Sequence, residues 1–438
     1  MATPNLIDRL FRTQRARDAA ALRRLRETCD TLMSERGAAN SAKFAALAME
    51  RYAALEDGAR EAFFGLLADR YAPDPERVLA CAKAYAAERS VENLAHLFHE
   101  VEPPRQELLR RINRGPHGTA ALVRMRVDLL KAMKTNPSLA AVDADFTHLF
   151  GSWFSPGFLE LVRVDWKSPA SLLEQIIRHE AVHAVRDWDD LRRRLEPDRR
   201  CFAFLHPALP NELLIFVEVA LLEEMPTAIG PLIEGHELDL RSATARCAVF
   251  YSISNCQPGL RGVSLGDFLI KRVCEILRRE IPSLRRFCTL SPMPGFAAWL
   301  RAGAALDAAR LPRGAGPRLE RARESARAAL ESGALAPDAG LLERLEPALR
   351  ETLVHLGAAY LYATRDTDPA SDPVAKFHLN NGARIERLNW LANRSRRGLS
   401  ESFGMMVNYV YDLDRIEDFH EGFINGRVAA SRDLSRQA

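Results

Sequence analysis

Hydrophobic and polar positions in roughly the first 185 residues alternate with the period of a helix. Apolar residues recur every three or four positions, and Ala, Leu, Arg and Glu dominate. Prolines and glycines interrupt the pattern where helices should begin or end, as at Pro73, Pro75 and Pro103. We therefore expect an all-α helical bundle over residues 1–186. Because it carries few chemical groups, we assign it to packing and self-association.

The pattern changes at about residue 187, and residues 187–438 mix strand and helix signals. Residues 201–205 and 212–222 are rich in β-forming residues, and the second segment is nearly all apolar, as in a central strand covered on both faces. We expect a late strand at residues 408–411 and a short strand or turn at residues 377–383. An Ala, Arg and Glu-rich segment near residues 301–350 predicts a surface helical insertion. The expected fold is thus α+β and multidomain, with a mixed α/β second domain.

A strand, a turn and a helix follow one another between residues 249 and 282. Apolar and polar residues alternate through residues 249–254, so a strand would place Ser252 and Ser254 on one face. Pro258 and three glycines end that strand, and a helical pattern follows until Pro282. The first turn of such a helix leaves amides free for an anion. The sequence therefore indicates a pyrophosphate site at this turn.

The same turn also matches an ordinary helix cap. Ser264 and Asp267 fit the Ser-x-x-Asp capping pattern, which would occupy some of these amides and place a carboxylate near any phosphate. Arg261, Lys271 and Arg272 could offset that carboxylate. The spacing by itself leaves both the phosphate site and the capped helix open.

Composition narrows the class of protein. A chain of 438 residues with 47% hydrophobic and 27% charged residues is expected to form two soluble globular domains, without a membrane span. The net charge is only +3, and basic residues are interleaved with acidic ones, so we expect no nucleic-acid partner. Seven cysteines without a Cys-x-x-Cys pair suit a reducing compartment. The N-terminus lacks the apolar core of a secretion signal. Early arginines, from Arg9 to Arg17, leave an amphipathic transit peptide open, but Asp8 and Asp18 weaken that interpretation, so a cytoplasmic protein is the default expectation.

A competing motif lies at residues 179–183, which spell His-Glu-Ala-Val-His. On a helix His179 and His183 would lie one turn apart and could hold zinc, with Glu180 placed to activate a bound water. A third ligand would be needed, and Glu212, Glu218 and Glu223 are the candidates. The alternative is that both histidines pack at a helix end.

Longer motifs resemble those of the malonyl-CoA decarboxylase family over most of the chain, most weakly before about residue 145 and in the 301–350 segment. They are Phe-Tyr-Ser-Ile-Ser at residues 250–254, Gly-Leu-x-Gly-Val-x-Leu-Gly at 259–266, Leu-Ser-Pro-x-Pro-Gly-Phe at 290–296, Phe-His-Leu-x-Asn-Gly-Ala at 377–383 and Asn-Tyr-x-Tyr at 408–411.

The resemblance implies a fold, partners and a site. The fold is an N-terminal helical oligomerisation domain, residues 1–186, followed by an acetyltransferase-like (GNAT) α/β catalytic domain, residues 187–438. The partners are malonyl-CoA, acetyl-CoA and further copies of the chain in a dimer or tetramer, with no membrane. The implied CoA-binding residues are Arg261, Gly262, Val263, Ser264, Leu265, Gly266 and Asp267.

By the same resemblance, Ser291 contacts the malonyl group and His378 donates the proton, with Ser252, Tyr411 and Asn381 as further substrate-binding residues. Loss of CO2 leaves an enolate, which needs donors at the thioester oxygen and a proton for the carbon. The thioester is its own electron sink, so we expect no metal, biotin or pyridoxal cofactor. An imidazole titrates near neutral pH, so we expect His378 to be protonated when the enolate forms.

Two positions depart from the family pattern. The family does not require a histidine at position 179, which makes the complete zinc motif look accidental. Family members often carry Glu where this chain has Ser264, so an acidic role there is in doubt. Two other functions remain: a GNAT-type acyltransferase, which would need an acceptor to consume malonyl-CoA, and a scaffold without activity.

Overall fold

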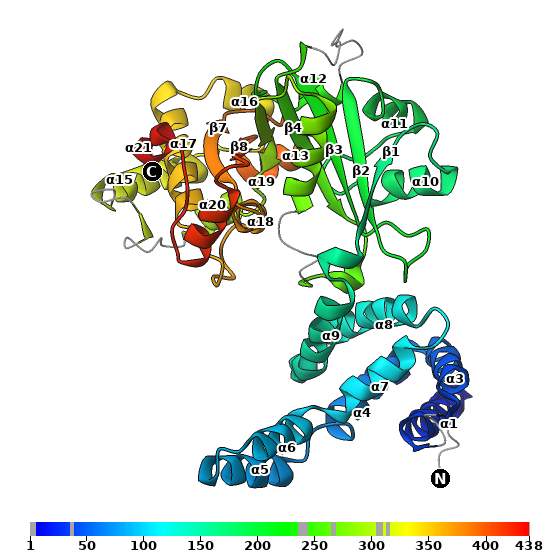
Figure 1. The fold of residues 1–438 in the computed structure, drawn as a ribbon. Helices are drawn as coiled ribbons and strands as arrows, with labels where there is room; N and C mark the ends of the chain where they lie inside the picture. Colours follow the sequence, from blue (N-terminus) through cyan, green and yellow to red (C-terminus); the bar gives the residue numbers. More distant parts are fainter. Residues whose placement is uncertain are drawn as a thin grey trace. The chain divides into compact units, whose positions relative to one another are not determined.

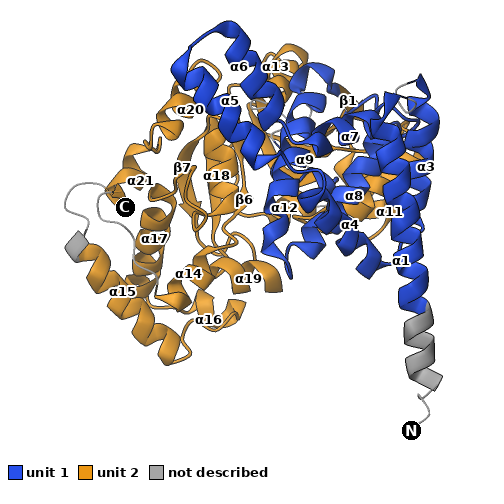
Figure 2. Ribbon diagram, turned by 90° about the horizontal axis from the view of Figure 1, so that it is seen from below, with its two compact units in different colours: residues 1–160, 205–212, 257–265 blue, residues 161–204, 213–256, 266–438 orange. Residues whose placement is uncertain are grey.

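The computed structural model describes residues 6–35, 39–234, 244–263, 269–303, 310–311 and 316–437. The chain forms two compact units (Figure 2). The first comprises residues 1–160, 205–212 and 257–265, and the second comprises the rest. The second unit thus begins before the expected boundary at residue 186, because the strand at Glu160–Val164 joins its sheet.

The first unit is helical, as the periodicity predicted (Figure 1). Its elements are α1 (Leu6–Met33), α3 (Ser41–Ala53), α4 (Asp57–Asp69), α5 (Pro75–Ala87), α6 (Val91–Val101), α7 (Pro104–Asn113), α8 (Gly118–Ala132), α9 (Ala140–Trp153) and the 3-10 turns η1 (Pro137–Leu139), η2 (Pro156–Phe158) and η4 (Pro258–Leu260). Prolines start α5 and α7 at their first positions, where the missing N–H costs nothing. Tyr52 and Phe63 meet edge to face in the core, with ring centroids 5.6 Å apart.

The second unit is built on a mixed sheet (Figure 1). Its strands are β1 (Glu160–Val164), β2 (Arg199–Leu205), β3 (Ile215–Leu222), β4 (Cys247–Asn255), β5 (Arg286–Thr289), β6 (Ser291–Pro292), β7 (Arg384–Asn389) and β8 (Met406–Tyr411). β4 and β5 are parallel, while β3 pairs antiparallel with both β2 and β4. The buried strand expected at residues 212–222 and the late strand at 408–411 are confirmed.

The helices of this unit follow or precede the strands. They are α10 (Ala170–His179), α11 (Trp188–Arg194), α12 (Gly230–Ile233), α13 (Leu269–Glu280), α14 (Phe296–Ala302), α15 (Gly316–Glu331), α16 (Ala339–Glu343), α17 (Pro347–Tyr362), α18 (Pro373–Asn380), α19 (Arg396–Ser402), α20 (Ile416–Ile424) and α21 (Arg432–Gln437). The expected α+β class, a helical region followed by a domain with a mixed sheet, is confirmed.

The sheet divides between β4 and β5, and this division positions the site. Their pairing ends at Phe250 and Thr289, with a last hydrogen bond from the Leu290 amide to the Phe250 carbonyl at 3.2 Å. Beyond it, residues 251–255, here named the β4 arm, pair only with β3 among the described residues. On the other side of the division the chain continues directly into Ser291.

Two of three local predictions need correction. Residues 377–380 belong to helix α18, not to a strand or turn, because Asp372 caps the helix by accepting hydrogen bonds from two of its first amides. The 301–350 segment is helical where the structure describes it, and α15 lies on the surface as expected, with Leu319 and Ala326 on a buried face and Arg327 exposed. Helix α10 ends at His179, so residues 180–183 are not helical.

Candidate active site

Ser291, His378 and Tyr411 form one hydrogen-bonded chain. The Ser291 hydroxyl oxygen lies 2.8 Å from Nε2 of His378, and the Tyr411 hydroxyl lies 2.7 Å from Nδ1 of the same ring. Three separate elements supply them: β6, α18 and β8. All three residues are buried. The structure therefore brings together three residues that are far apart in sequence and that the family resemblance implied as site residues.

The donor and acceptor roles of the two ring nitrogens depend on the tautomer of His378. Ser291 donates its hydroxyl hydrogen to Oγ1 of Thr289, 2.9 Å away. When the ring hydrogen is on Nε2, His378 donates to the Ser291 oxygen and Tyr411 donates to Nδ1; the other tautomer reverses both roles. With the hydrogen on Nε2, a continuous chain of donors runs from Tyr411 through His378 and Ser291 to Thr289.

The His378 ring is neutral at pH 7. Burial lowers its pKa from the ordinary 6.5 to about 3, and the ring stacks on Tyr409 with centroids 4.5 Å apart. Burial also raises the pKa of Tyr411 well above its usual range, so the phenol stays protonated. This differs from the protonated ring expected from sequence, because the sequence could not show that the imidazole is removed from water.

Two predicted substrate-binding residues lie outside this chain of hydrogen bonds. The Asn381 side chain donates to the Phe377 carbonyl at 2.9 Å and so holds the C-terminal end of α18. Ser252 donates to Glu180 Oε2 at 2.7 Å, on the β4 arm. Thr289 was missed by the sequence reasoning, although Thr289 and Ser291 alternate with Leu290 and the period of two places them on one face.

A cavity of about 1310 Å³ is lined by sequence neighbours of the site, and its lining includes none of Ser291, His378, Tyr411 or the residues of the β4 arm. Residues 180–184, which are hydrogen-bonded to the β4 arm, line one part of it, and Pro292 and Pro294, which follow Ser291, line another. Val374, one helical turn before His378, also lines it. The cavity offers space for a ligand beside the buried chain of hydrogen bonds.

The predicted CoA-binding segment is only partly described. Arg261, Gly262 and Val263 lie at the end of the described stretch, and Ser264, Leu265, Gly266 and Asp267 lie outside the described residues. Arg126 of α8 donates to the carbonyls of Gly259 and Arg261, both at 2.8 Å.

Close packing fixes the same stretch. A Cβ at Gly259 would overlap the Val123 carbonyl oxygen, so only glycine fits there. Gly262 has a φ of 75°, which also favours glycine. The backbone that leads into the predicted CoA segment is therefore held by helix α8 of the first unit.

The His-Glu-x-x-His motif does not take the helical form that a zinc site of this type requires. The chain leaves α10 at His179, and Glu180 accepts hydrogen bonds from the amides of Val182 and His183 at 2.8 and 2.7 Å. Burial, then Arg194 and Arg397, lower the pKa of His183 to about 4. In the part of the chain that the structure describes, no three His, Cys, Asp or Glu side chains are grouped to hold a metal ion.

Comparison with known proteins agrees with the motifs. The chain matches the family described as malonyl-CoA decarboxylase C-terminal domain over residues 157–438, and the corresponding N-terminal domain over residues 71–154. It is 37% identical to mitochondrial malonyl-CoA decarboxylase of Anser anser anser over 386 residues, covering 83% of this chain and 76% of that protein. It is 38% identical to the enzyme of Rattus norvegicus, covering 73% and 67%.

Solved structures give the same result. The crystal structure of malonyl-CoA decarboxylase from Rhodopseudomonas palustris is 44% identical, covers 95% of this chain and 99% of its own, and superposes with a TM-score of 0.83. That from Agrobacterium vitis is 42% identical, covers 94% and 99%, and has a TM-score of 0.81. With both domains matched and the Ser291–His378 pair in place, the chain belongs to the malonyl-CoA decarboxylase family.

Proposed function

We propose that this protein is a carboxy-lyase that converts malonyl-CoA to acetyl-CoA and CO2 with Ser291 and His378 at the reacting atoms. Membership of the family supports the reaction. The buried chain of hydrogen bonds through Ser291, His378 and Tyr411 is the observation that supports the residues. A cofactor is not required, because the thioester accepts the electron pair.

The reaction breaks the bond between Cα and the carboxylate. The electron pair stays on Cα and spreads onto the thioester oxygen, while CO2 leaves. The Ser291 hydroxyl can turn from Thr289 towards that oxygen and donate to it as negative charge develops there. A donor held in a site shielded from water is more effective than one in solution, since the local dielectric is low.

His378 then protonates Cα as a neutral ring. Its Nε2–H supplies the proton, and Tyr411 replaces it by donating its own proton to Nδ1. The net charge of the site does not change through these steps. The negative charge is first on the malonyl carboxylate, then on the enolate, and after proton transfer on the hydrogen-bonded residues that have lost a proton. Solvent restores the missing proton when the product leaves. The low pKa of His378 therefore does not prevent it from acting as the acid.

Residues 261–267 are proposed to bind the CoA pyrophosphate. A segment that leads to the first turn of a helix can offer free amides to a phosphate, and Arg261 adds a positive charge. Arg126 and the close packing at Gly259 hold the preceding backbone, which supports a fixed entry to this segment.

Self-association through the helical unit is proposed from the α5–α6 pair. These two helices pack on each other, and neither has a buried residue, although all residues of both are described. Val91 is 85% exposed and Phe98 is 72% exposed. Large apolar side chains so exposed indicate a surface that another copy covers. We propose a dimer or tetramer formed there.

The cellular location stays a prediction. Among the described residues, no helix has both the length and the apolar character needed to cross a bilayer. The vertebrate relatives carry the word mitochondrial in their names. We keep the cytoplasmic location expected from the sequence, which fractionation of the native cells would test.

The function is tested by incubating the purified protein with malonyl-CoA without any acceptor and following acetyl-CoA and CO2. Equal amounts of both products are expected. An acyltransferase would consume malonyl-CoA only after an amine acceptor is added, and a scaffold would not consume it at all. Either result would overturn the proposed function.

A further inference from the structure

Glu180 lies where helix α10 ends, and its carboxylate closes a tight turn. Oε1 accepts hydrogen bonds from the amides of Val182 and His183 at 2.8 and 2.7 Å. The residue is only 8% exposed. The first carboxylate oxygen therefore fixes the backbone of residues 180–183.

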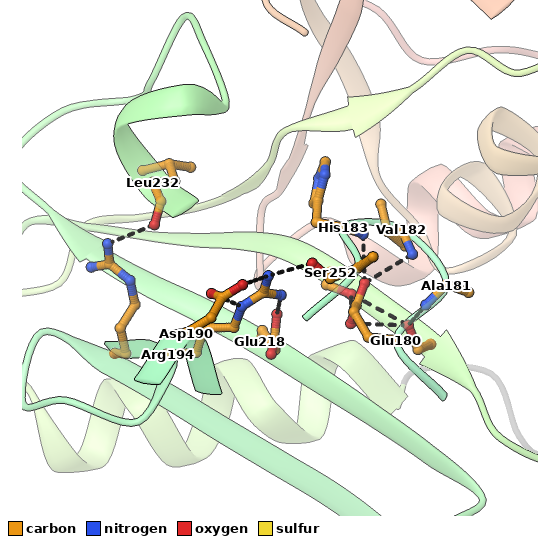
Figure 3. Close-up of polar contacts among 12 residues, drawn as sticks. Glu180, Ala181, Val182, His183, Asp190, Arg194, Glu218, Leu232 and Ser252 are labelled. Atoms are coloured by element: carbon orange, nitrogen blue, oxygen red, sulfur yellow. Dashed lines mark hydrogen bonds and ion pairs between the residues drawn. The ribbon is translucent and has the colours of Figure 1, made fainter. Parts of the chain in front are cut away.

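The second carboxylate oxygen reaches the β4 arm (Figure 3). Oε2 accepts from the Ser252 hydroxyl at 2.7 Å and from the Ser254 hydroxyl at 3.3 Å. The Ser254 oxygen in turn accepts from the Ala181 amide at 3.2 Å. One side chain thus joins the turn to the strand through the two serines that the sequence placed on one face.

The turn itself is anchored from two other directions. Arg397 of α19 donates to the Ala181 carbonyl at 2.7 Å. Arg194 of α11 donates to the Ala184 carbonyl at 3.3 Å and to Glu218 Oε2 at 3.1 Å. Because Glu218 lies opposite Ser252 in the β3–β4 ladder, the contact of Arg194 with Glu218 lies on the same part of the sheet as the arm (Figure 3).

The β4 arm needs such an attachment. Within the described residues it has a neighbouring strand only on the β3 side, and the β3–β4 register shifts between Glu218 and Val219, where β4 supplies Tyr251 as an additional residue. Backbone pairing with β5 therefore does not set the distance from the arm to Ser291. The hydrogen bonds of the arm's two serines with Glu180 and with the Ala181 amide add to the β3 pairing in holding the arm.

We propose that Glu180 is a positioning residue for decarboxylation, which holds the Ser252 side of the divided sheet at the separation from Ser291 that the malonyl thioester requires. This inference rests on the proposed function, since it assumes that the reacting group lies at this division. Glu180 acts here by hydrogen bonding alone and transfers no proton.

Comparison of Glu180→Ala with Glu180→Gln tests the inference. Alanine removes the four hydrogen bonds that Glu180 accepts and leaves the Ala181 amide as the remaining link to Ser254, so the attachment of the arm to the turn is weakened. A misplacement of about 1 Å costs up to about 100-fold in rate, and we expect kcat to fall by about 10- to 100-fold. Glutamine keeps an oxygen that can accept from the two amides. Its NH2 group can donate to the two serines, because a serine hydroxyl can accept a hydrogen bond as well as donate one. We expect Glu180→Gln to restore kcat to near the wild-type value.

The dissociation constant of CoA, measured by calorimetry, should be unchanged in both variants, because CoA lacks the acyl group that this part of the site holds. Glu280→Ala is the matched control. It removes a carboxylate of the same unit that pairs with Arg163 and Arg200 but does not touch the β4 arm, and its kcat should equal that of the wild type.

If Glu180→Ala does not fold, the variant with both Ser252→Ala and Ser254→Ala gives the same test, because it detaches the arm and leaves the turn closed. We expect the same loss of kcat. Two results would overturn the inference. One is a wild-type kcat in Glu180→Ala or, where that does not fold, in the double serine variant; the other is a loss of kcat in Glu180→Gln as large as that in Glu180→Ala. Failure of the wild-type protein itself to decarboxylate malonyl-CoA would instead overturn the proposed function.

Discussion

Nε2 of His378 lies 2.8 Å from the hydroxyl oxygen of Ser291, although 87 positions separate the two residues in sequence. Ser291 lies directly beyond the point where β4 and β5 separate, and His378 reaches it from α18. The Tyr411 hydroxyl completes the contact at the other ring nitrogen. Each member therefore depends on the others for its hydrogen-bond partner, and this dependence leads to the first prediction.

Replacing His378 by asparagine should lower kcat by about 10²- to 10⁴-fold, the usual cost of losing a positioned general acid. The affinity for CoA should be kept, because other residues bind the nucleotide. Ser291→Ala should also lower kcat. Steady-state kinetics of both single variants and of the double variant will show whether the two residues act as a unit. If they do, kcat of the double variant should be only slightly lower than kcat of the less active single variant. Full activity in His378→Asn, with the fold confirmed by circular dichroism, would contradict the proposed mechanism.

The pH dependence of kcat/KM distinguishes a neutral ring from a charged one, because this constant reports ionisations of the free enzyme. Burial holds the pKa of His378 at about 3, so the ring is neutral from pH 5 to 8 and its state does not change there. We expect no fall in kcat/KM through pH 6.5. A ring with the ordinary pKa that had to be protonated would lose activity about tenfold per pH unit above about 6.5. The inhibition constant of CoA, measured over the same range, corrects for titration of the phosphates.

Glu218 should make stability depend on pH. Burial, and then the nearby Glu180, raise the pKa of Glu218 to about 8. The folded state therefore binds a proton that the unfolded state has already lost above pH 4.5, so its stabilising contribution is complete below that pH and disappears as pH rises through about 8.

The variant Glu218→Gln isolates this effect, since glutamine stays neutral. Between pH 4.5 and 8 the unfolding free energy of the wild type should fall relative to that of the variant, by at most about 1.4 kcal/mol per pH unit. Urea unfolding with equal m-values in both proteins provides the measurement. A difference independent of pH would show that Glu218 is ionised in the folded protein.

Gly259→Ala should destabilise the protein by about 1–3 kcal/mol, the usual cost of overpacking, because the added Cβ would overlap the Val123 carbonyl oxygen. The KM for malonyl-CoA should rise as well if the segment after Gly259 binds the pyrophosphate. Gly65→Ala is the control: nothing lies within 4 Å of its added Cβ, and within helix α4 it should stabilise by about 0.5–1 kcal/mol. An unchanged KM in folded Gly259→Ala would place the CoA site elsewhere.

Phe98→Asp should lower the oligomeric state, because a charge would be buried in any interface formed by α5 and α6. Analytical ultracentrifugation gives the mass of each species. Ile424→Asp serves as the control, since Ile424 is 53% exposed on α20 of the second unit. A wild-type protein that is monomeric at micromolar concentration, or a Phe98→Asp protein of unchanged mass, would argue against this surface.

The sequence by itself determined the elements whose signals are local. The three- to four-residue period gave the N-terminal helices, the alternation at residues 249–254 gave β4 with both serines on one face, and prolines gave the starts of α5 and α7. Ser291, His378 and Tyr411 were chosen through the family motifs, since no local pattern distinguishes a catalytic serine from a serine in a turn.

The tertiary structure decided what depends on contacts between distant residues. Residues 377–380 are helical because Asp372 caps them, and Glu180 binds Ser252 and Ser254 because α10 ends beside β4, which turns a zinc-like motif into a link between a turn and a strand. The tertiary structure also decides the charge of the His378 ring. Only the fold removes the ring from water, and desolvation, which no sequence pattern reports, is what lowers its pKa.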